Sequence, residues 1–262
     1  MNTSNIEGIP VSVVERVSLV LEALSAGPPM TLAKVTTRTG LPRSSAHRLL
    51  EQLANAGWLA RSPDQTYELG VKAYEMGQAA LNQNRLLHHA RPVMHAFAQR
   101  TGLTIQLGVV DRGGDTVYLA KVNGRISGPT PTAVGQRVPA HLTALGKVVM
   151  AYASLSGPLS RRGPQGSPAE KSFTPLHQHV SKRSWPRSAT GGAPHSTVVR
   201  RSPGIACVGV SIGPPEHMYG NLAALSVCAR VGAFDHQKMV SPLRLVAGEI
   251  WQRCVTADLA NH

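Results

Sequence analysis

Residues 31–53 read TLAKVTTRTGLPRSSAHRLLEQL, and this stretch decides the fold of the N-terminal part of the chain. Thr31 can cap a short helix that reaches Thr37. Glycine and proline then form a tight turn at residues 40–42, and Pro42 suits the first turn of a following helix. In that helix, apolar side chains recur at the i, i+3, i+4 and i+7 spacing of one buried stripe, at Ala46, Leu49, Leu50 and Leu53. The stretch therefore predicts two helices joined by a tight turn.

The face opposite this stripe is polar and basic. It carries, near the N-terminal end of the helix, Arg43, Ser44, His47 and Arg48, and Ser45 is a further candidate in the same turn. Arginines and short hydrogen-bonding side chains at this place are what contacts to phosphates and base edges require. Further candidates to contact DNA are Thr31, Lys34 and Arg61. For any single arginine, a merely solvated surface is the alternative, but the order of the surrounding elements favours DNA binding.

Elements on both sides of these helices complete a small domain. Ser12 and Glu15 form a capping box, and apolar residues then recur at helical spacing as far as Leu24. The sequence Gly-Pro-Pro at residues 27–29 ends this first helix. Residues 58–61 and 66–69 are typical of short strands, and the turn Ser62-Pro63-Asp64-Gln65 between them indicates a β wing. Together these elements predict a winged helix-turn-helix.

The rest of the chain mixes helical and strand patterns. Residues 70–83 suit a linking helix, and the apolar spacing from Leu86 to Phe97 predicts another. Residues 104–110 and 116–122 flank a Gly-rich turn and predict a β-hairpin. Residues 207–212 and 222–229 are typical of buried strands, and apolar positions from Met239 to Ile250 mark a terminal helix. This mixture predicts an α+β domain.

Three stretches resemble one known family. Residues 12–24 (SVVERVSLVLEAL) and 30–70 are similar to the winged helix-turn-helix of IclR-type bacterial transcription regulators, in which TGLPRSSAHRLL is a specific motif. Residues 134–152 (VGQRVPAHLTALGKVVMAY) resemble the effector-domain signature of this family, where a strand leads into a helix beside the ligand pocket. The resemblance implies a winged helix-turn-helix domain at residues 1–69, a linker helix at 70–84 and a GAF-like α+β effector-binding domain at 85–262.

The resemblance also implies a function and a ligand site. A regulator of this family is expected to form a homodimer or tetramer, to bind operator DNA as a repressor or activator, and to respond to a small metabolite, usually a carboxylate or aromatic acid. By the match of the strands PGIACVGVSIG and NLAALSVCARV, the residues that face this effector are Ala144 and Leu145 (through their backbone), Cys207, Ser226 and Cys228. A helix start suits a carboxylate on physical grounds, because its first N–H groups can bind an anion. For the cysteines alone, packing as small buried side chains is the alternative.

The net charge of +13 is not concentrated in the candidate DNA-binding domain. Residues 1–78 hold seven basic and seven acidic side chains, so their net charge is zero. Residues 152–203 hold eight basic residues and one acidic residue, together with ten Ser and seven Pro. More than half of the positive surplus therefore belongs to this middle segment, and the charge of the whole chain is no argument for DNA binding.

The middle segment is anomalous in two ways. No apolar period survives in it, which predicts loop or disorder. It also departs from the family pattern. In that pattern, helices and then a strand followed by acidic residues precede the strand that corresponds to the one at Cys207. The segment is nevertheless about as long as the part of the family pattern that it replaces. Compensating frameshifts would keep the length and change the composition, so our hypothesis is that about residues 153–202 are out of frame. The alternative function is then a ligand-sensing or oligomerisation protein without DNA regulation, because the effector domain is damaged.

Other classes of protein are disfavoured. No apolar run approaches the ~18 residues needed to cross a bilayer, and the N-terminus lacks the pattern of a signal peptide. The cysteines at 207, 228 and 254 form no CxxC pair. The chain holds no HExxH or GxxxxGK[ST] motif and no paired Cys/His spacing. We therefore expect a cytoplasmic protein that is not an enzyme, needs no cofactor or metal, and has no membrane partner.

Overall fold

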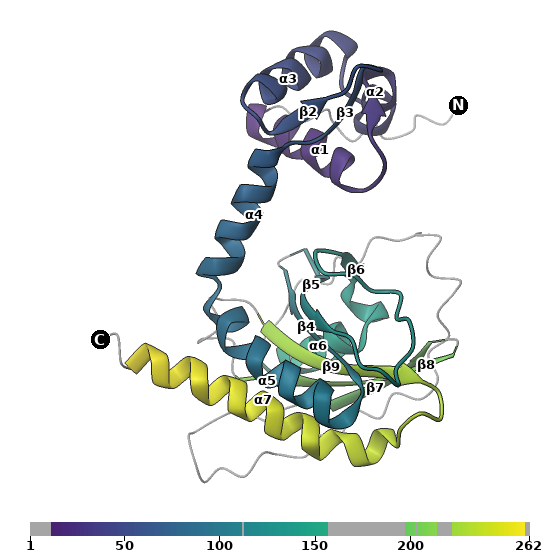
Figure 1. The fold of residues 1–262 in the computed structure, drawn as a ribbon, viewed down its shortest axis with the longest axis vertical. Coiled ribbons are helices and arrows are strands. Elements are labelled where there is room, and N and C mark those ends of the chain that lie inside the picture. Colours follow the sequence, from purple (N-terminus) through teal and green to yellow (C-terminus); the bar gives the residue numbers. More distant parts are fainter. Residues whose placement is uncertain (1–11, 112, 157–196, 203, 214–221, 260–262) are drawn as a thin grey trace. The chain divides into compact units, whose positions relative to one another are not determined.

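A computed structural model describes residues 12–111, 113–156, 197–202, 204–213 and 222–259 of the chain (Figure 1). Contacts between residues divide the chain into two compact units, Met1–Gln83 and Asn84–His262. Each unit has its own secondary structure and its own buried core.

The N-terminal unit is a winged helix-turn-helix, as the sequence predicts. Its elements are α1 (Val13–Ser25), β1 (Met30–Thr31), α2 (Leu32–Thr39), α3 (Arg43–Asn55), β2 (Leu59–Arg61), β3 (Thr66–Leu69) and α4 (Val71–Gln83). The capping box of α1 is confirmed, because the Glu15 N–H donates to Ser12 Oγ over 3.1 Å and the Ser12 N–H donates to Glu15 Oε2 over 3.2 Å. Strand β3 pairs with β2 as the predicted wing and also with β1, which is too short to show a sequence pattern.

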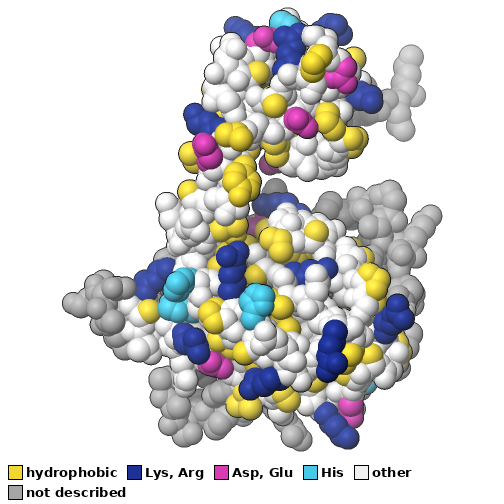
Figure 2. Space-filling view, in the orientation of Figure 1, with side chains coloured by type: hydrophobic (Ala, Val, Ile, Leu, Met, Phe, Trp, Pro, Cys, Tyr) yellow, Lys and Arg dark blue, Asp and Glu magenta, His cyan; other side chains and the backbone are white. Residues whose placement is uncertain are grey.

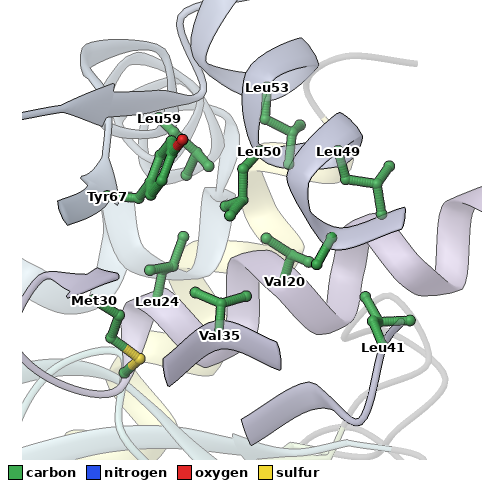
Figure 3. Packing of buried hydrophobic residues seen from close by; sticks show 11 residues of the cluster. Val20, Leu24, Met30, Val35, Leu41, Leu49, Leu50, Leu53, Leu59 and Tyr67 are labelled. Atoms are coloured by element: carbon green, nitrogen blue, oxygen red, sulfur yellow. The ribbon is translucent and has the colours of Figure 1, made fainter. Parts of the chain in front are cut away.

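The core of this unit is closed by side chains from its own helices and wing. The stripe predicted on α3 is confirmed, since Ala46 and Leu50 are fully buried and Leu49 and Leu53 nearly so. Figure 3 shows this stripe facing α1, with Leu59 and Tyr67 of the wing beside it. Burial of each large apolar side chain contributes roughly 1.5–3 kcal/mol, so this cluster fixes which face of α3 points outward.

The turn between α2 and α3 depends on Gly40. Its φ of 70° lies in the left-handed region that favours glycine, and its N–H donates to Thr36 O over 2.9 Å. The next residue, Leu41, is only 3% exposed and returns the chain to the core. Helix α3 then begins at Arg43, directly after Pro42, so its basic residues lie in its first two turns.

The C-terminal unit is an α+β domain built on one antiparallel sheet. Its elements are α5 (Arg85–Thr101), β4 (Thr104–Val110), β5 (Asp115–Val122), β6 (Arg137–Pro139), the 3-10 turn η1 (Ala140–Leu142), α6 (Ala144–Ser156), β7 (Thr197–Ser202), β8 (Ile205–Ile212), β9 (Leu222–Arg230) and α7 (His236–Leu259). The strands lie in the order β6-β5-β4-β9-β8-β7. The predicted hairpin, the two predicted late strands and the terminal helix are confirmed.

Helices cover both faces of this sheet. Because alternate residues of a strand face opposite sides, Cys207 and Gly209 of β8 share one face with their partners on β9, Cys228 and Ser226. Helix α6 packs on this face, since a Cβ added at Gly209 would lie 2.9 Å from Ala144 O. Helices α5 and α7 contact each other and cover the other face (Figure 1). The sheet is therefore buried on both sides at its centre.

The structure corrects the expectation that residues 153–202 form no regular structure. Residues 153–156 end α6, and residues 197–202 form β7, which pairs with β8 from Thr197↔Val210 to Ser202↔Ile205. The run of β-branched residues at the start of β7 suits a strand, and the exposed edge of β8 supplies the partner that sequence periodicity does not reveal. The rest of the frameshift hypothesis concerns residues 157–196, which lie outside the described residues. So do residues 214–221, which follow Gly213.

Candidate functional site

The polar face of α3 lies at the surface of the N-terminal unit. The side chains of Arg43, Ser44, His47 and Arg48 are exposed, and Ser45 is half-buried. Ser44, His47 and Arg48 fall at i, i+3 and i+4, so they form one row along the helix. This row points away from the core, because the apolar stripe of α3 occupies the opposite face.

A shallow hollow lies beside the first turn of α3. It is lined by Leu32 of α2 and by Arg43, Ser44 and His47. Pro42 occupies the N-cap without a side-chain hydrogen bond, and no acidic residue lies in the first turn. The first N–H groups of a helix have no acceptor within the helix and carry partial positive charge. Together with Arg43, they make this end of α3 suitable for a phosphate group.

Arg61 belongs to a cluster that joins the wing to α3. Its Nη1 donates to Glu51 Oε1 over 2.9 Å, its Nη2 donates to Gln65 Oε1, and its guanidinium carbon lies 5.6 Å from the centroid of the Tyr67 ring. Burial raises the pKa of Tyr67, and the hydrogen bond to the Glu51 carboxylate raises it further, against a smaller lowering effect of Arg61. Arg61 therefore holds the wing in place, and a phosphate would have to share its guanidinium with Glu51.

Thr31 and Lys34 lie at the start of α2. Thr31 Oγ1 accepts from the Lys34 N–H over 3.5 Å, so Thr31 is the predicted cap of this helix. Lys34 is exposed, while Thr31 is half-buried. On the face of the N-terminal unit that Figure 2 shows, Lys and Arg side chains are spread out with Asp and Glu between them. This mixture agrees with the zero net charge of residues 1–78.

A cavity of about 300 Å³ lies in the C-terminal unit, on the face of the sheet that α6 covers. Of the residues expected to face an effector, Ala144, Cys207, Ser226 and Cys228 line it. Leu145 is not among the lining residues, and its side chain is 1% exposed in a core cluster, so the contact expected through its backbone stays a prediction. Sequence reasoning did not single out the remaining lining residues, which are Gln106, Tyr118, Thr130, Pro131, Thr132, Gln136, Arg137, Val138, Pro139, Leu142, Thr143 and Ile205.

The N-terminus of α6 forms one wall of this cavity. Thr143 Oγ1 accepts from the Gly146 N–H over 2.8 Å and lies 2.9 Å from Thr116 Oγ1 of β5, so Thr143 caps α6 and ties it to the sheet. The N–H groups of Ala144 and Leu145 belong to the first turn, where a helix offers them no acceptor. The helix dipole favours a negatively charged group at this wall.

The segment 123–136 after β5 supplies another wall and is fastened to the sheet by two side chains. Lys121 Nζ donates to Thr132 O over 2.6 Å and to Thr130 O over 3.3 Å, and Gln106 Nε2 donates to Thr132 Oγ1. Burial lowers the pKa of Lys121, against an opposing effect of Cys228. Thr130 Oγ1 is buried and has no hydrogen-bond partner in the described part of the chain. Buried polar atoms are normally paired, so this hydroxyl is suited to a ligand.

Arg137 brings a positive charge to the rim of the cavity. It forms an ion pair with Asp111, lies 3.9 Å from Asp115 Oδ2, and keeps 60% of its side chain exposed. Burial by itself would raise the pKa of Asp111, but the hydrogen bonds from the Asp115 N–H and from Arg137 outweigh it and hold this pKa below its usual value. Among the described residues, no Asp or Glu lines the cavity.

Within the described ranges, no three side chains of His, Cys, Asp or Glu gather where they could hold a metal ion. No helix in this part of the chain is long and apolar enough to span a bilayer. The third cysteine, Cys254, is buried in α7 and does not line the cavity.

Comparison with known proteins identifies similar sequences for both units. Residues 13–63 match the family described as IclR helix-turn-helix domain, and residues 78–156 match the family described as Bacterial transcriptional regulator IclR C-terminal. The HTH-type transcriptional regulator XynR of Escherichia coli (strain K12) is 30% identical over 141 residues, which are 53% of this chain and 56% of XynR. The DNA-binding transcriptional repressor YiaJ of the same organism is 32% identical over 138 residues, 51% of this chain and 48% of YiaJ. The chain spans about half the length of the curated relatives it matches, and these are named for transcriptional regulation, not for catalysis.

Solved structures share the fold over nearly the whole chain. The structure of an IclR homolog from Microbacterium hydrocarbonoxydans, complexed with 4-hydroxybenzoate, has a TM-score of 0.67 and 24% identity, and the match covers 94% of this chain and 100% of that one. The structure of a transcriptional regulator from Alicyclobacillus acidocaldarius has a TM-score of 0.67 and 20% identity, covering 92% and 98%. At these identities the likeness concerns the fold alone.

Proposed function

Because the chain belongs to the IclR family of bacterial transcriptional regulators, we propose that it is a sequence-specific DNA-binding regulator controlled by a small-molecule effector in the cytoplasm. The observation that carries this proposal is the exposed row of Ser44, His47 and Arg48 on α3, next to an uncapped and basic helix start. A surface that contacts only solvent has no requirement for an exposed polar row and an uncapped, basic helix start at the same end of one helix.

The exposed face of α3 supports a specific set of proposed DNA contacts. In each of two copies, α3 enters the major groove of one half of a pseudo-palindromic operator, and the wing lies beside it. The first N–H groups of α3 and the Ser44 hydroxyl bind phosphate, while Arg43 or Arg48 offers the paired donors that recognise guanine. Arg61 positions the wing through Glu51.

Two copies are needed for such an operator, and we propose a homodimer that assembles further into a tetramer. Large apolar side chains on α1 and α4 support this assembly: Val13 is 65% exposed, Val14 74%, Val71 72% and Tyr74 68%. Clusters of exposed apolar residues are typical of protein interfaces. Sedimentation of the full chain tests this proposal, and a monomer at micromolar concentration would contradict it.

The effector proposed is a small carboxylate, in particular an aromatic acid. A cavity of about 300 Å³ has the size of a small-molecule site, and its apolar walls suit a ring. The start of α6 and Arg137 favour a carboxylate, and Thr130 Oγ1 offers an unused hydroxyl. The solved relative that holds 4-hydroxybenzoate carries a ligand of this class. Binding would shift the population between operator-competent and operator-incompetent states.

A gel shift with the full chain and the DNA upstream of its own gene tests this function. We expect binding that prefers this DNA over a scrambled duplex, weakens steeply as salt rises, and changes when aromatic acids are added. Thermal shift with the same acids reports ligand binding separately. Equal binding to the operator and the scrambled duplex would overturn the DNA-binding proposal, and an unchanged melting temperature with every acid would overturn the ligand class.

The second candidate function follows from the place where the family match ends, at residue 156. If about residues 153–202 are out of frame, the chain is a ligand-sensing or oligomerisation protein that no longer regulates DNA. Sequencing of the gene in independent isolates tests this hypothesis. A single open frame in all of them, together with protease resistance of the segment in the purified protein, would overturn it. Ligand binding without operator binding would favour this candidate.

A further inference from the structure

Two cysteines face each other on the floor of the cavity. Cys207 of β8 is the direct antiparallel partner of Cys228 of β9, so their side chains lie on the same face of the sheet. Both line the cavity. Cys228 is 5% exposed, while Cys207 is half-buried. A pair of thiols in register, open to the same small cavity, is a different chemical group from a single packed cysteine.

The spacing of such a pair suits a disulfide bond. Directly opposed residues of antiparallel strands have Cα atoms about 4.5 or 5.5 Å apart and Cβ atoms about 4.5–5.5 Å apart. In disulfides, the two Cα atoms are about 4.4–6.8 Å apart and the two Cβ atoms about 3.5–4.5 Å apart. The Cα atoms can therefore stay where they are, and closure requires the two Cβ atoms to approach by at most about 1 Å. Gly209, the next residue of β8 on this face, has no side chain to resist the adjustment.

Polar groups around the pair suit thiol chemistry. Cys228 Sγ lies 3.7 Å from Gln106 Oε1 and 3.9 Å from Ser226 Oγ. Lys121, held by the carbonyls of Thr130 and Thr132, is close enough to Cys228 for a charge interaction, although burial is the larger effect and lowers the pKa of Lys121. Cys254 lies on α7, outside this environment.

We propose that Cys207 and Cys228 form a reversible disulfide when a small hydroperoxide enters the cavity. The thiolate of the more accessible Cys207 attacks one peroxide oxygen, which gives a sulfenic acid on Cys207 and an alcohol or water from the peroxide. The Cys228 thiol then attacks the sulfenic sulfur, the S–S bond forms, and water leaves. The overall change is two thiols and one hydroperoxide to one disulfide, one alcohol or water, and one water. A cross-strand bond of this kind carries strain, which makes it easy to reduce.

Peptide mapping of the full reduced chain tests the proposal directly. Trypsin cleaves after Arg201 and Arg230, so both cysteines lie on one peptide, residues 202–230, and Cys254 lies on another, residues 254–262. After treatment with hydrogen peroxide and alkylation under denaturing conditions, we expect the first peptide to lose two hydrogens and take no alkyl group. The second peptide should be alkylated in full, and dithiothreitol should restore two alkylation sites on the first.

The matched variants are Cys254→Ala, which should keep the internal bond, and Cys207→Ala and Cys228→Ala, which should abolish it. Mapping of the unaltered chain decides the matter even if a variant fails to fold. Disulfides between chains, a bond that includes Cys254, or sulfinic acid on Cys207 with Cys228 still alkylated would each overturn the proposal. So would full alkylation of all three thiols after exposure that oxidises a free peptide thiol.

The consequence for ligand binding rests on the proposed function and has its own readout. A disulfide removes the thiol that Cys228 offers to Gln106 and reshapes the floor of the cavity. We expect the affinity for a ligand found by thermal shift to fall at least tenfold in the oxidised chain, and to stay unchanged by peroxide in Cys207→Ala. If no acid binds, the proposed effector class fails while the mapped disulfide still stands.

Discussion

Tyr67 donates its phenolic hydrogen to Glu51 Oε1 over 2.9 Å, which ties strand β3 of the wing to helix α3 across sixteen residues of sequence. The same carboxylate oxygen accepts from Arg61. Glu51 thus receives one donor from each wing strand, and the orientation of the wing relative to α3 depends on it.

The substitution Tyr67→Phe removes one of these donors and keeps the buried ring. We expect a loss of about 1 kcal/mol in the free energy of unfolding, the size of one hydrogen bond. Because the fold raises the pKa of Tyr67, this stability is present below the usual phenol pKa of 10.0 and is lost as pH rises through the raised value. Urea unfolding between pH 7 and 11 measures it. A difference in the free energy of unfolding between the Tyr67→Phe and unaltered chains that does not shrink as pH rises would contradict the prediction.

Removal of a basic side chain from the exposed row of α3 should weaken operator binding. Arg43→Ala and Arg48→Ala are each expected to cost ~1–3 kcal/mol if the side chain recognises a base, which corresponds to a loss of roughly 5- to 150-fold in affinity. Quantitative gel shift at fixed salt is the measurement. Arg100→Ala, at the end of α5 in the other unit, is the matched loss of charge. Unchanged affinity in both α3 variants would remove α3 as the recognition helix.

Two glycine substitutions should change stability in opposite directions. A Cβ at Gly209 would lie 2.9 Å from Ala144 O, so Gly209→Ala pushes α6 away from the sheet and should destabilise the C-terminal unit by ~1–3 kcal/mol. Gly77 lies within α4 with no atom near the added Cβ, so Gly77→Ala should stabilise that helix by about 0.8 kcal/mol. Thermal denaturation with separate probes for the two units measures both effects. A stabilising Gly209→Ala would show that α6 does not pack as described.

The ion pair between Asp111 and Arg137 should make the free energy of unfolding depend on pH in the acidic range. The fold holds the pKa of Asp111 below its usual 3.8, so its contribution is present above about this pH and is lost as pH falls through the lowered value. Asp111→Asn should cost about 1 kcal/mol at pH 6 and less at pH 3. Urea unfolding at both pH values tests this, with Glu22→Gln, an exposed carboxylate of α1, as a control. A constant difference between the chains at the two pH values would argue against the ion pair.

Local patterns in the sequence were sufficient for the N-terminal unit. The residues that form the stripe on α3 lie close together in the sequence, and so do those that form the turn at Gly40. The core that contains them confirms the prediction. The role of Arg61 could not be predicted in this way. Its partner Glu51 is ten residues away on a different element, so a surface arginine in the sequence becomes a tie between wing and helix only in the fold.

The cavity shows the same limit in the C-terminal unit. The strands at Cys207 and Cys228 are visible as apolar runs, but the sequence does not reveal that they are neighbours in register. Gln106 and Tyr118 reach the cavity from strands whose alternation was clear, yet only the sheet order shows which face they share. Thr130 and Thr132 belong to an irregular segment, whose path depends on the hydrogen bonds from Lys121 and Gln106 and on no local periodicity.

Among the described residues, the buried hydrophobic cluster of the winged helix-turn-helix consists of side chains between Val17 and Tyr67. We therefore expect this DNA-binding domain to keep its fold when it is transferred to another protein. Residues 1–83, grafted onto the sensing domain of a different regulator, should carry their operator preference with them. The reverse exchange would join the C-terminal unit of this chain to a DNA-binding domain whose operator is known. A change in binding to that operator would then report which ligand the cavity binds.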